Sequence, residues 1–207
     1  MIESVKISAA VFIPVCASVG IPPAVFVSAP VVISETTSAC GSAGLDLSVA
    51  VNAILSASKP HSFLGLNGQG RVAIVRTKGN AYGHIVLRGG DGRPNYDTVS
   101  ISIVEQALTK AKLPHNIVVD CSHANSYKKP ELQPLVMADI VNQIRLGNKS
   151  LVGVMIESNI EAGNQSIPAD LSQLKYGCSV TDGCVDWNTT EKMIRDAAVL
   201  LRALTAP

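Results

Sequence analysis

The stretch Asn116-Ile-Val-Val-Asp-Cys-Ser-His-Ala-Asn-Ser126 decides the fold, because an apolar run ends there in a dense group of polar side chains. Residues 116–119 are mostly β-branched, which is typical of a short buried strand. Residues 120–126 then bring together a carboxylate, a thiol, two hydroxyls, an imidazole and an amide. A strand that delivers side chains into a shared site at its carboxyl end explains this composition. Alone, His123 at its centre is equally compatible with a structural, hydrogen-bonded histidine.

The same alternation of apolar runs and helical patterns extends on both sides of this stretch. Hydrophobic spacing predicts further strands over residues 62–66, 84–87 and 151–156. It predicts helices over residues 45–58, 69–77, 97–112, 130–146 and 189–204. We expect Asp97 to cap the third of these helices and Gly147 to end the fourth.

Three of the four predicted strands end in polar side chains, namely Arg88, the 120–126 cluster and Glu157. Functional side chains at the carboxyl ends of successive parallel strands are typical of a (β/α)8 barrel. The predicted fold class is therefore α/β of the (β/α)8 TIM-barrel type, with right-handed crossovers between parallel strands. A doubly wound sheet is the alternative.

Composition excludes several kinds of partner. The chain has 207 residues, of which 47% are hydrophobic and only 16% charged, and its net charge is +1. This balance indicates strands covered on both faces and gives no electrostatic reason to bind nucleic acid. Five cysteines without a Cys-x-x-Cys pair are unlike a disulfide framework, so we expect a reducing, cytoplasmic location.

Residues 1–43 form an unassigned apolar segment. Residues 7–34 carry no charged side chain and include four prolines. So many prolines argue against a membrane helix of about 20 residues, and the runs 9–14 and 24–34 are compatible with strands. A targeting segment is the alternative. We expect the regular domain to occupy residues 44–207.

Three residues are candidate ligands for one divalent metal ion: His123, Glu157 and Asp182. Each follows its own apolar segment, so folding can bring them to one rim, and an imidazole with carboxylates suits Mn, Fe, Co or Zn. Arg88 precedes two glycines and suits a bound anion, because its guanidinium grips phosphate with two hydrogen bonds. The alternatives are a solvated carboxylate at Glu157, a cap at Asp182 and a salt-bridged arginine at Arg88.

Several longer motifs occur in one order that resembles a known family. They are Leu87-Arg-Gly-Gly90, Val119-Asp-Cys-Ser-His-Ala-Asn-Ser126, Gly153-Val-Met-Ile-Glu-Ser158, Gly163-Asn-Gln165 and Tyr176-Gly-Cys-Ser-Val-Thr-Asp-Gly-Cys184. Together they resemble class I 3-deoxy-D-arabino-heptulosonate 7-phosphate (DAHP) synthase. The resemblance implies a transferase that condenses phosphoenolpyruvate with erythrose 4-phosphate, the first step of the shikimate pathway and of aromatic amino acid biosynthesis.

The resemblance also implies roles for individual residues. His123, Glu157 and Asp182 match three of the family's four metal ligands, Arg88 matches an arginine for the phosphoenolpyruvate phosphate, and His123 lies beside that substrate as a catalytic residue. The polar neighbours of His123 are expected to hold its ring in one tautomer: Asp120, Ser122, Asn125 and Ser126. The parent enzyme is expected to be a homo-oligomer, with no nucleic-acid or membrane partner.

The family's N-terminal motifs are missing from this chain. They are a cysteine that serves as the fourth ligand, Lys-Pro-Arg-Thr, Gly-Ala-Arg and Gly-Phe-Lys-Asn. A full barrel takes about 250 residues, so we expect residues 44–207 to supply only the C-terminal half-barrel, strands five to eight. The alternative to an active enzyme is a truncated or misframed, catalytically incompetent half-barrel fragment.

Overall fold

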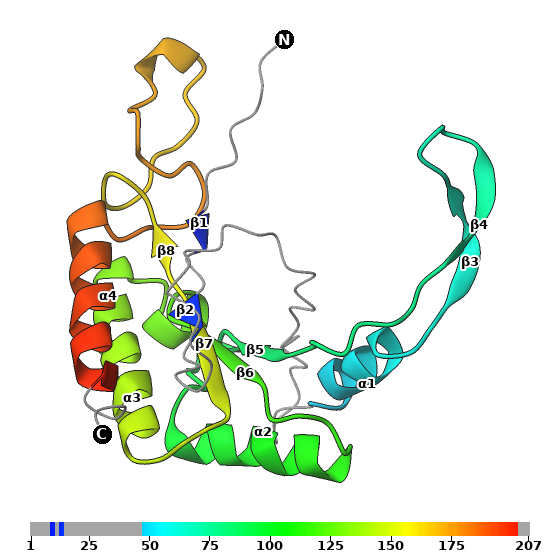
Figure 1. Ribbon diagram of the computed structural model, residues 1–207. Helices are drawn as coiled ribbons and strands as arrows, with labels where there is room; N and C mark the ends of the chain where they lie inside the picture. The colour runs from blue at the N-terminus through cyan, green and yellow to red at the C-terminus, as the bar shows by residue number, and fades with distance from the viewer. Residues whose placement is uncertain (1–8, 11–12, 15–46, 203–207) are drawn as a thin grey trace.

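The structure is a computed structural model that describes residues 9–10, 13–14 and 47–202 (Figure 1). Its α-helices are α1 (Ser48–Ala57), α2 (Thr98–Lys110), α3 (Gln133–Arg145) and α4 (Trp187–Arg202). Its strands are β1 (Ala9–Ala10), β2 (Ile13–Pro14), β3 (Ser62–Leu66), β4 (Val72–Arg76), β5 (Ile85–Leu87), β6 (Ile117–Asp120), β7 (Leu151–Met155) and β8 (Glu157–Ser158). Short 3-10 turns are η1 (His123–Ser126), η2 (Pro130–Leu132) and η3 (Leu171–Gln173).

The central sheet has the order β2-β7-β6-β5. Strands β5, β6 and β7 are parallel, so Leu87 pairs with Val119 and Val119 with Val154. The predicted strands over 84–87, 116–119 and 151–156 are confirmed, and their carboxyl ends lie on one edge. The β2 strand is antiparallel to β7 at the far side, and β1 is antiparallel to β8.

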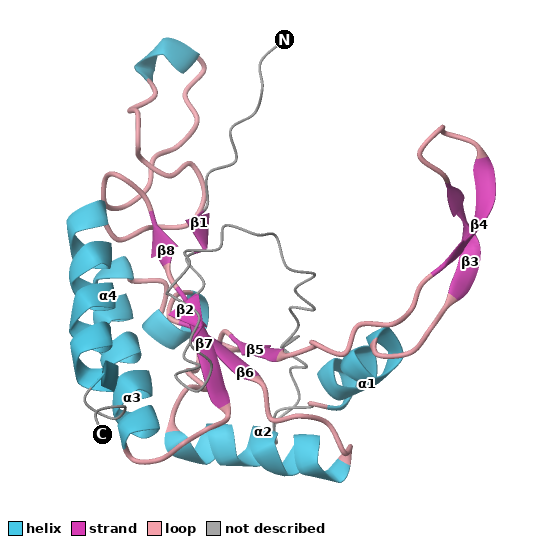
Figure 2. Cartoon of the chain, viewed as in Figure 1, coloured by secondary structure: helices cyan, strands magenta, loops and turns pink. Residues whose placement is uncertain are grey.

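Helices cover this sheet and bury one apolar core. Strands β5 and β6 are buried along their whole length, as expected for parallel strands covered on both faces. Helices α3 and α4 lie side by side, and α2 runs along the sheet from the end of the loop after β5 (Figure 2). Asp97 caps α2, accepting hydrogen bonds from the N–H groups of Val99 and Ser100, and a left-handed Gly147 follows α3. Both predicted boundaries are confirmed.

Two sequence expectations about residues 62–77 are wrong. Strand β3 is not a parallel neighbour of β5 but pairs antiparallel with β4, with Ser62 opposite Arg76 and Leu66 opposite Val72. The helix expected over residues 69–77 is the strand β4 instead. Its sequence, Val-Ala-Ile-Val-Arg, is rich in β-branched residues, which favour a strand once another strand is available for pairing.

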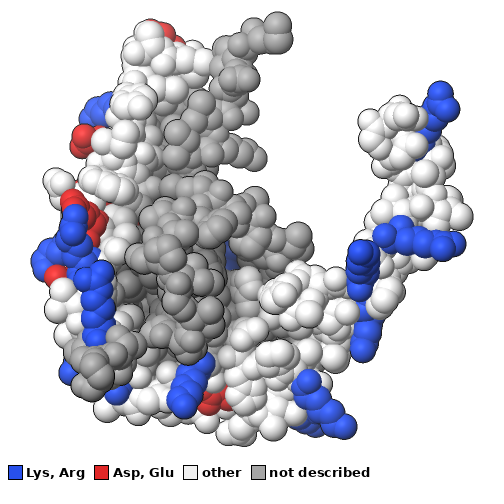
Figure 3. Space-filling view, in the orientation of Figure 1, with Lys and Arg blue, Asp and Glu red and all other residues white. Residues whose placement is uncertain are grey.

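The β3–β4 hairpin projects away from the rest of the molecule (Figure 1). It exposes large apolar side chains on both of its strands, namely Phe63, Leu64, Leu66, Val72 and Ile74. The space-filling view shows basic side chains on this arm (Figure 3). Between residues 47 and 90 the chain has five lysines and arginines and no aspartate or glutamate. The hairpin is therefore apolar, basic and without a partner strand at either edge among the described residues.

The described residues confirm an α/β fold with a parallel core, and their sheets do not close into a barrel. The strand expected over 24–34 and the domain boundary expected at residue 44 lie outside the described residues. Among the described helices, none combines the length and the apolar character needed to cross a bilayer.

Candidate metal and anion site

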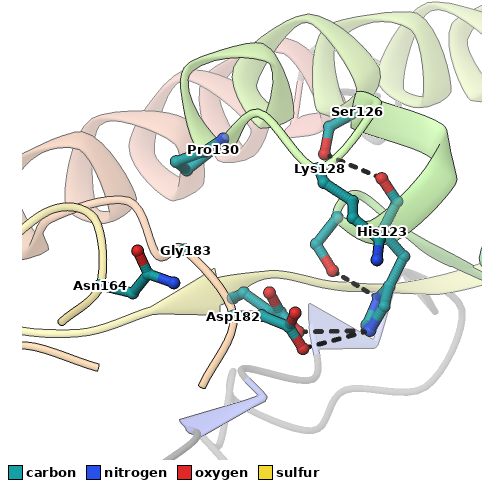
Figure 4. Close-up of a pocket in the computed structure, with 9 residues that line it drawn as sticks. His123, Ser126, Lys128, Pro130, Asn164, Asp182 and Gly183 are labelled. Atoms are coloured by element: carbon teal, nitrogen blue, oxygen red, sulfur yellow. Dashed lines mark hydrogen bonds and ion pairs between the residues drawn. The ribbon is translucent and has the colours of Figure 1, made fainter. Parts of the chain in front are cut away.

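Three side chains from separate elements converge at the carboxyl edge of the sheet. His123 comes from η1 after β6, Glu157 from β8 after β7, and Asp182 from the loop before α4. His123 Nε2 lies 3.5 Å from Glu157 Oε1 and 3.9 Å from Asp182 Oδ2. All three ligand atoms lie within 4.8 Å of one another. Figure 4 shows His123 and Asp182 directed toward each other in the pocket.

The end of β6 fixes the orientation of the His123 ring. Asp120 Oδ2 lies 2.9 Å and Ser122 Oγ 2.7 Å from His123 Nδ1. Asp120 Oδ1 also accepts hydrogen bonds from the Ser122 N–H and hydroxyl, at 2.9 and 2.8 Å. A proton on Nδ1 shared with this buried carboxylate leaves the Nε2 lone pair directed at Glu157 and Asp182.

The electrostatics of the site favour a positive charge between these groups. The hydrogen bond that His123 donates to Asp120 raises the pKa of His123 above its ordinary value of 6.5, with the charge of Glu157 acting in the same direction. Burial raises the pKa of Glu157, and the neighbouring carboxylates of Asp182 and Asp120 raise it further. The carboxylates of Asp120, Glu157 and Asp182 lie close enough to favour a cation among them, and that cation is either a proton or a metal ion.

The donor set fits a divalent metal. One imidazole nitrogen and two carboxylate oxygens are ligands for Mn, Fe, Co and Zn. Ligand atoms that bond one ion at about 2.0–2.2 Å lie within roughly 4 Å of each other. The two distances from His123 meet this limit, and the whole set spreads slightly wider, to 4.8 Å. The side chains of His123 and Glu157 are about four-fifths buried, whereas that of Asp182 is 57% exposed.

Arg88 lies at the same edge, directly after β5. Its side chain is exposed, and its positive charge opposes the larger effects that raise the pKa of His123. Gly89 follows with φ +72°, and a Cβ atom there would lie 2.7 Å from both Ala124 Cβ and the Arg93 carbonyl oxygen. Only glycine therefore allows the loop after β5 to pack against the turn that carries His123.

Two buried asparagines, Asn95 and Asn125, join these loops, and sequence reasoning did not identify the first. Asn95 Oδ1 accepts a hydrogen bond from the Gly89 N–H at 2.8 Å, and the Asn95 N–H donates to Asn125 Oδ1 at 2.9 Å. Asn125 Nδ2 donates to the carbonyl oxygens of Leu87 and Asp120, at 3.0 and 2.8 Å. The network ties the end of β5 to the end of β6.

Of the four residues expected to hold the His123 ring in one tautomer, two contact the ring and two do not. Asp120 and Ser122 contact the His123 ring, as expected. Asn125 instead bridges the two strands, and the Ser126 hydroxyl donates to the His123 main-chain oxygen at 3.5 Å. These two residues fix the backbone of the turn, so their effect on the imidazole is indirect.

The Gly163-Asn-Gln165 motif holds the loop that carries Asp182. Gly163 and Cys184 exchange two main-chain hydrogen bonds, at 2.8 and 3.1 Å. Asn164 Nδ2 donates to the Thr181 carbonyl oxygen at 2.7 Å, and Gln165 Nε2 donates to the Cys178 carbonyl oxygen at 3.0 Å. The motif thus has a structural explanation: its polar groups replace the pairing that a regular strand provides.

Comparisons with known proteins show which family the chain is similar to. The family model described as "DAHP synthetase I family" matches residues 25–195. The chain is 45% identical over 150 residues to the Tyr-sensitive phospho-2-dehydro-3-deoxyheptonate aldolase of Salmonella typhimurium, covering 72% of this chain and 42% of that protein. It is 47% identical over 158 residues to the tyrosine-inhibited enzyme of Schizosaccharomyces pombe, covering 75% and 42%.

A solved structure is similar as well. The phospho-2-dehydro-3-deoxyheptonate aldolase of Francisella tularensis SCHU S4 superposes with a TM-score of 0.71 and 44% sequence identity. The match covers 76% of this chain and 45% of that structure's chain. The chain therefore spans less than half the length of these relatives.

Proposed function

Because the chain belongs to the DAHP synthetase I family, we propose that its site serves DAHP synthase chemistry. In this reaction phosphoenolpyruvate condenses with erythrose 4-phosphate and one water molecule is consumed, to give DAHP and inorganic phosphate. The observation that carries the proposal is the convergence of His123, Glu157 and Asp182 at the carboxyl edge of the sheet, where Arg88 directly follows β5. A metal-ligand set next to an anion-binding arginine is what a phosphorylated, carboxylated substrate and an aldehyde require together.

His123 Nε2, Glu157 and Asp182 are proposed to hold one divalent ion, drawn from Mn, Fe, Co and Zn. When bound, such an ion acts as a Lewis acid toward a carbonyl oxygen. Asp120 accepts a hydrogen bond from the Nδ1–H group of His123, which leaves the unprotonated Nε2 to bind the ion. The Ser122 hydroxyl donates to the same carboxylate, which limits rotation of the ring.

Arg88 is proposed to bind the phosphate of phosphoenolpyruvate. Its guanidinium offers paired N–H donors in a plane that matches phosphate oxygens. The Asn95–Asn125 network fixes the loop that carries Arg88 relative to the turn that carries His123. The protein therefore sets the distance between the anion and the ligand set before substrate arrives, which reduces the entropic cost of the reaction.

The proposed architecture is the C-terminal part of a (β/α)8 barrel over residues 44–207, to which residues 1–43 add the short strands β1 and β2. It is supported by the parallel β5-β6-β7 sheet with its polar carboxyl edge. The proposed location is the cytoplasm, with neither nucleic acid nor membrane as a partner. A homo-oligomeric parent enzyme is supported by the apolar hairpin β3–β4.

A second candidate is a catalytically incompetent half-barrel. It is favoured by the scarcity of positive charge at the site. The described residues that line the pocket are Ser122, His123, Ser126, Lys128, Pro130, Glu157, Asn164, Asp182 and Gly183, and Lys128 is the only lysine or arginine among them. The two substrates carry two phosphates and a carboxylate, so Arg88 and Lys128 neutralise only part of their charge.

Isothermal titration of the purified chain with Mn and with Zn tests the metal site. We expect binding that His123→Ala abolishes and that His115→Ala leaves unchanged. His115 is an exposed histidine whose ring contacts Thr109, away from the pocket. Binding that survives His123→Ala, or no binding by the unmodified chain, overturns the proposed site.

A further inference from the structure

We propose that Gln133 is a positioning residue for the metal site, holding the main chain of Glu157 so that its carboxylate faces His123. The inference rests on the proposed function and adds to it a residue outside the ligand set. Gln133 is the first residue of α3, ten positions after His123, and sequence reasoning gave it no role.

The contact uses both ends of the Gln133 carboxamide on one residue. Gln133 Nε2 donates to the Glu157 carbonyl oxygen at 3.1 Å, and Gln133 Oε1 accepts from the Glu157 N–H at 3.0 Å. The side-chain amide thus pairs with Glu157 as a neighbouring strand would. The Glu157 carbonyl oxygen also accepts a hydrogen bond from the Val185 N–H at 3.0 Å. Glu157 therefore has three hydrogen bonds that fix its backbone, and Gln133 provides two of them.

The burial of the Gln133 side chain means that both of its polar atoms need hydrogen-bond partners. Its side chain has 0% exposure, although glutamine is mostly an exposed residue and loses much rotamer freedom on burial. A buried amide without partners is strongly unfavourable. Both bonds are therefore needed where they are, and they permit a single placement of the side chain.

Gln133 also connects the elements that carry the ligands. The chain from His123 through η1 and η2 leads directly into α3, so Gln133 closes a link between the His123 turn and β8. In the same segment Pro130 lies against Gly183, where an added Cβ atom would approach Pro130 Cγ to 3.3 Å. Residues 130–133 thus touch Glu157 on one side and the neighbour of Asp182 on the other.

Removing the amide should loosen Glu157 without removing a ligand. After Gln133→Met, the Glu157 carbonyl oxygen keeps Val185, but the Glu157 N–H loses its partner. Residues that orient metal ligands typically affect metal affinity by about 10–100-fold. We expect the Kd for Mn or Co to rise by about tenfold or more, and the visible spectrum of bound Co to change.

Gln143 is a matched control within the same helix. It is also buried, and its Nε2 donates to a main-chain oxygen, that of Tyr96, and to Asp139, both at 2.8 Å. It lies ten residues, or about 15 Å along the helix axis, from Gln133. Gln143→Met should lower thermal stability as a buried amide loss does, while leaving metal affinity within about twofold.

The experiment compares the unmodified chain, Gln133→Met and Gln143→Met by metal titration, circular dichroism and thermal melting. Gln133→Asn is a second variant, polar but too short to reach both Glu157 groups, and it should also weaken metal binding. Weaker binding in both Gln133 variants at a stability equal to that of Gln143→Met supports the positioning role. Equal affinity in all variants, or equal loss in Gln143→Met, overturns it while leaving the proposed metal site intact. Absence of metal binding by the unmodified chain overturns the proposed function, and this inference with it.

Discussion

Asp120 Oδ2 lies 2.9 Å from His123 Nδ1, on the opposite side of the ring from Glu157 and Asp182. One nitrogen of the imidazole is therefore held by a buried carboxylate, while the other faces two acidic side chains. The contact with Asp120 therefore determines which nitrogen of His123 carries the proton, how readily the ring becomes charged and where its Nε2 atom points.

Asp120→Asn tests this relationship. The hydrogen bond that His123 donates to the Asp120 carboxylate is the largest cause that raises the His123 pKa, so replacing the carboxylate should lower that pKa, measurable by NMR titration of the ring. Metal affinity should also fall about 10–100-fold, because the ring is no longer oriented. The affinity is measured at a pH above the His123 pKa that the titration gives for each protein, and an unchanged affinity there contradicts the orienting role.

The metal-free protein should lose stability as pH rises above the ordinary pKa values of Glu157 and His123, 4.5 and 6.5. The folded-state pKa values of His123 and Glu157 are both raised above their ordinary values of 6.5 and 4.5. A raised pKa means that the stabilising form is the protonated one, which is fully present below the unfolded pKa and is lost as pH rises through the folded pKa. Thermal melting across this range measures the effect.

Two comparisons isolate the source of that pH dependence. His123→Asn should flatten the melting temperature across the same range, since the main titrating group is gone. A saturating divalent metal should reverse the trend, because the ligands bind it in their deprotonated forms. If the metal-free chain becomes more stable as pH rises through this range, the assigned directions of the two pKa shifts are wrong.

Gly89→Ala should damage the site far more than Gly92→Ala. Both glycines have left-handed backbones, with φ +72° and +71°, so alanine at either costs about 1–2 kcal/mol in strain. At Gly89 the new Cβ also collides with Ala124, Arg93 and Asn125, adding about 1–3 kcal/mol. At Gly92 nothing lies within 4 Å. Urea unfolding measures the difference.

The same pair of variants reports on anion binding. Displacing the loop after β5 should move Arg88 away from the His123 turn, so Gly89→Ala should weaken phosphoenolpyruvate binding in a titration and Gly92→Ala should not. Equal binding by the two variants shows that the Gly89 contact does not position Arg88.

The β3–β4 hairpin should promote self-association. Leu64 and Ile74 pair across the two strands and are 75% and 65% exposed, and unpaired apolar strand edges favour association. Leu64→Lys together with Ile74→Glu should raise the concentration at which the chain associates by about tenfold or more. Analytical ultracentrifugation measures this shift.

Leu135→Lys together with Val199→Glu is the matched control for the hairpin pair. It removes two other exposed apolar side chains, on α3 and α4, with the same change in charge. Association that responds equally to both double variants indicates general surface hydrophobicity instead of a hairpin contact.

The 207-residue chain alone should have little DAHP synthase turnover. It lacks the family's Lys-Pro-Arg-Thr and Gly-Phe-Lys-Asn motifs, and loss of a single preorganised donor can cost about 100-fold or more. Phosphate release from phosphoenolpyruvate and erythrose 4-phosphate in the presence of Mn is the assay. A rate of about 1 per second or more means that residues 1–43 contribute chemistry that their sequence does not reveal.

Local sequence determined the framework of the described fold. Apolar runs followed by polar residues are enough to locate β5, β6 and β7 in the sequence. They also predict that the polar carboxyl ends of these strands lie at one edge of the sheet, because the strands are parallel. Caps such as Asp97 and the left-handed Gly147 act within a few residues, so the boundaries of α2 and α3 were predictable. The ligand candidates His123 and Glu157 were visible for the same reason, since each follows an apolar strand segment, whereas Asp182 lies in the loop before α4.

Tertiary structure decided what depends on distant partners. Residues 69–77 form a strand because β3 lies beside them, a pairing that a short apolar pattern leaves ambiguous between helix and strand. Asn125 reaches Leu87 across 38 residues, and Gln133 reaches Glu157 across 24. The sequence placed Asn125 in the group around His123 and gave Gln133 no role, but the main-chain partners of both amides depend on the fold, because a polar side chain becomes a positioning group only when folding buries it against an unpaired main chain.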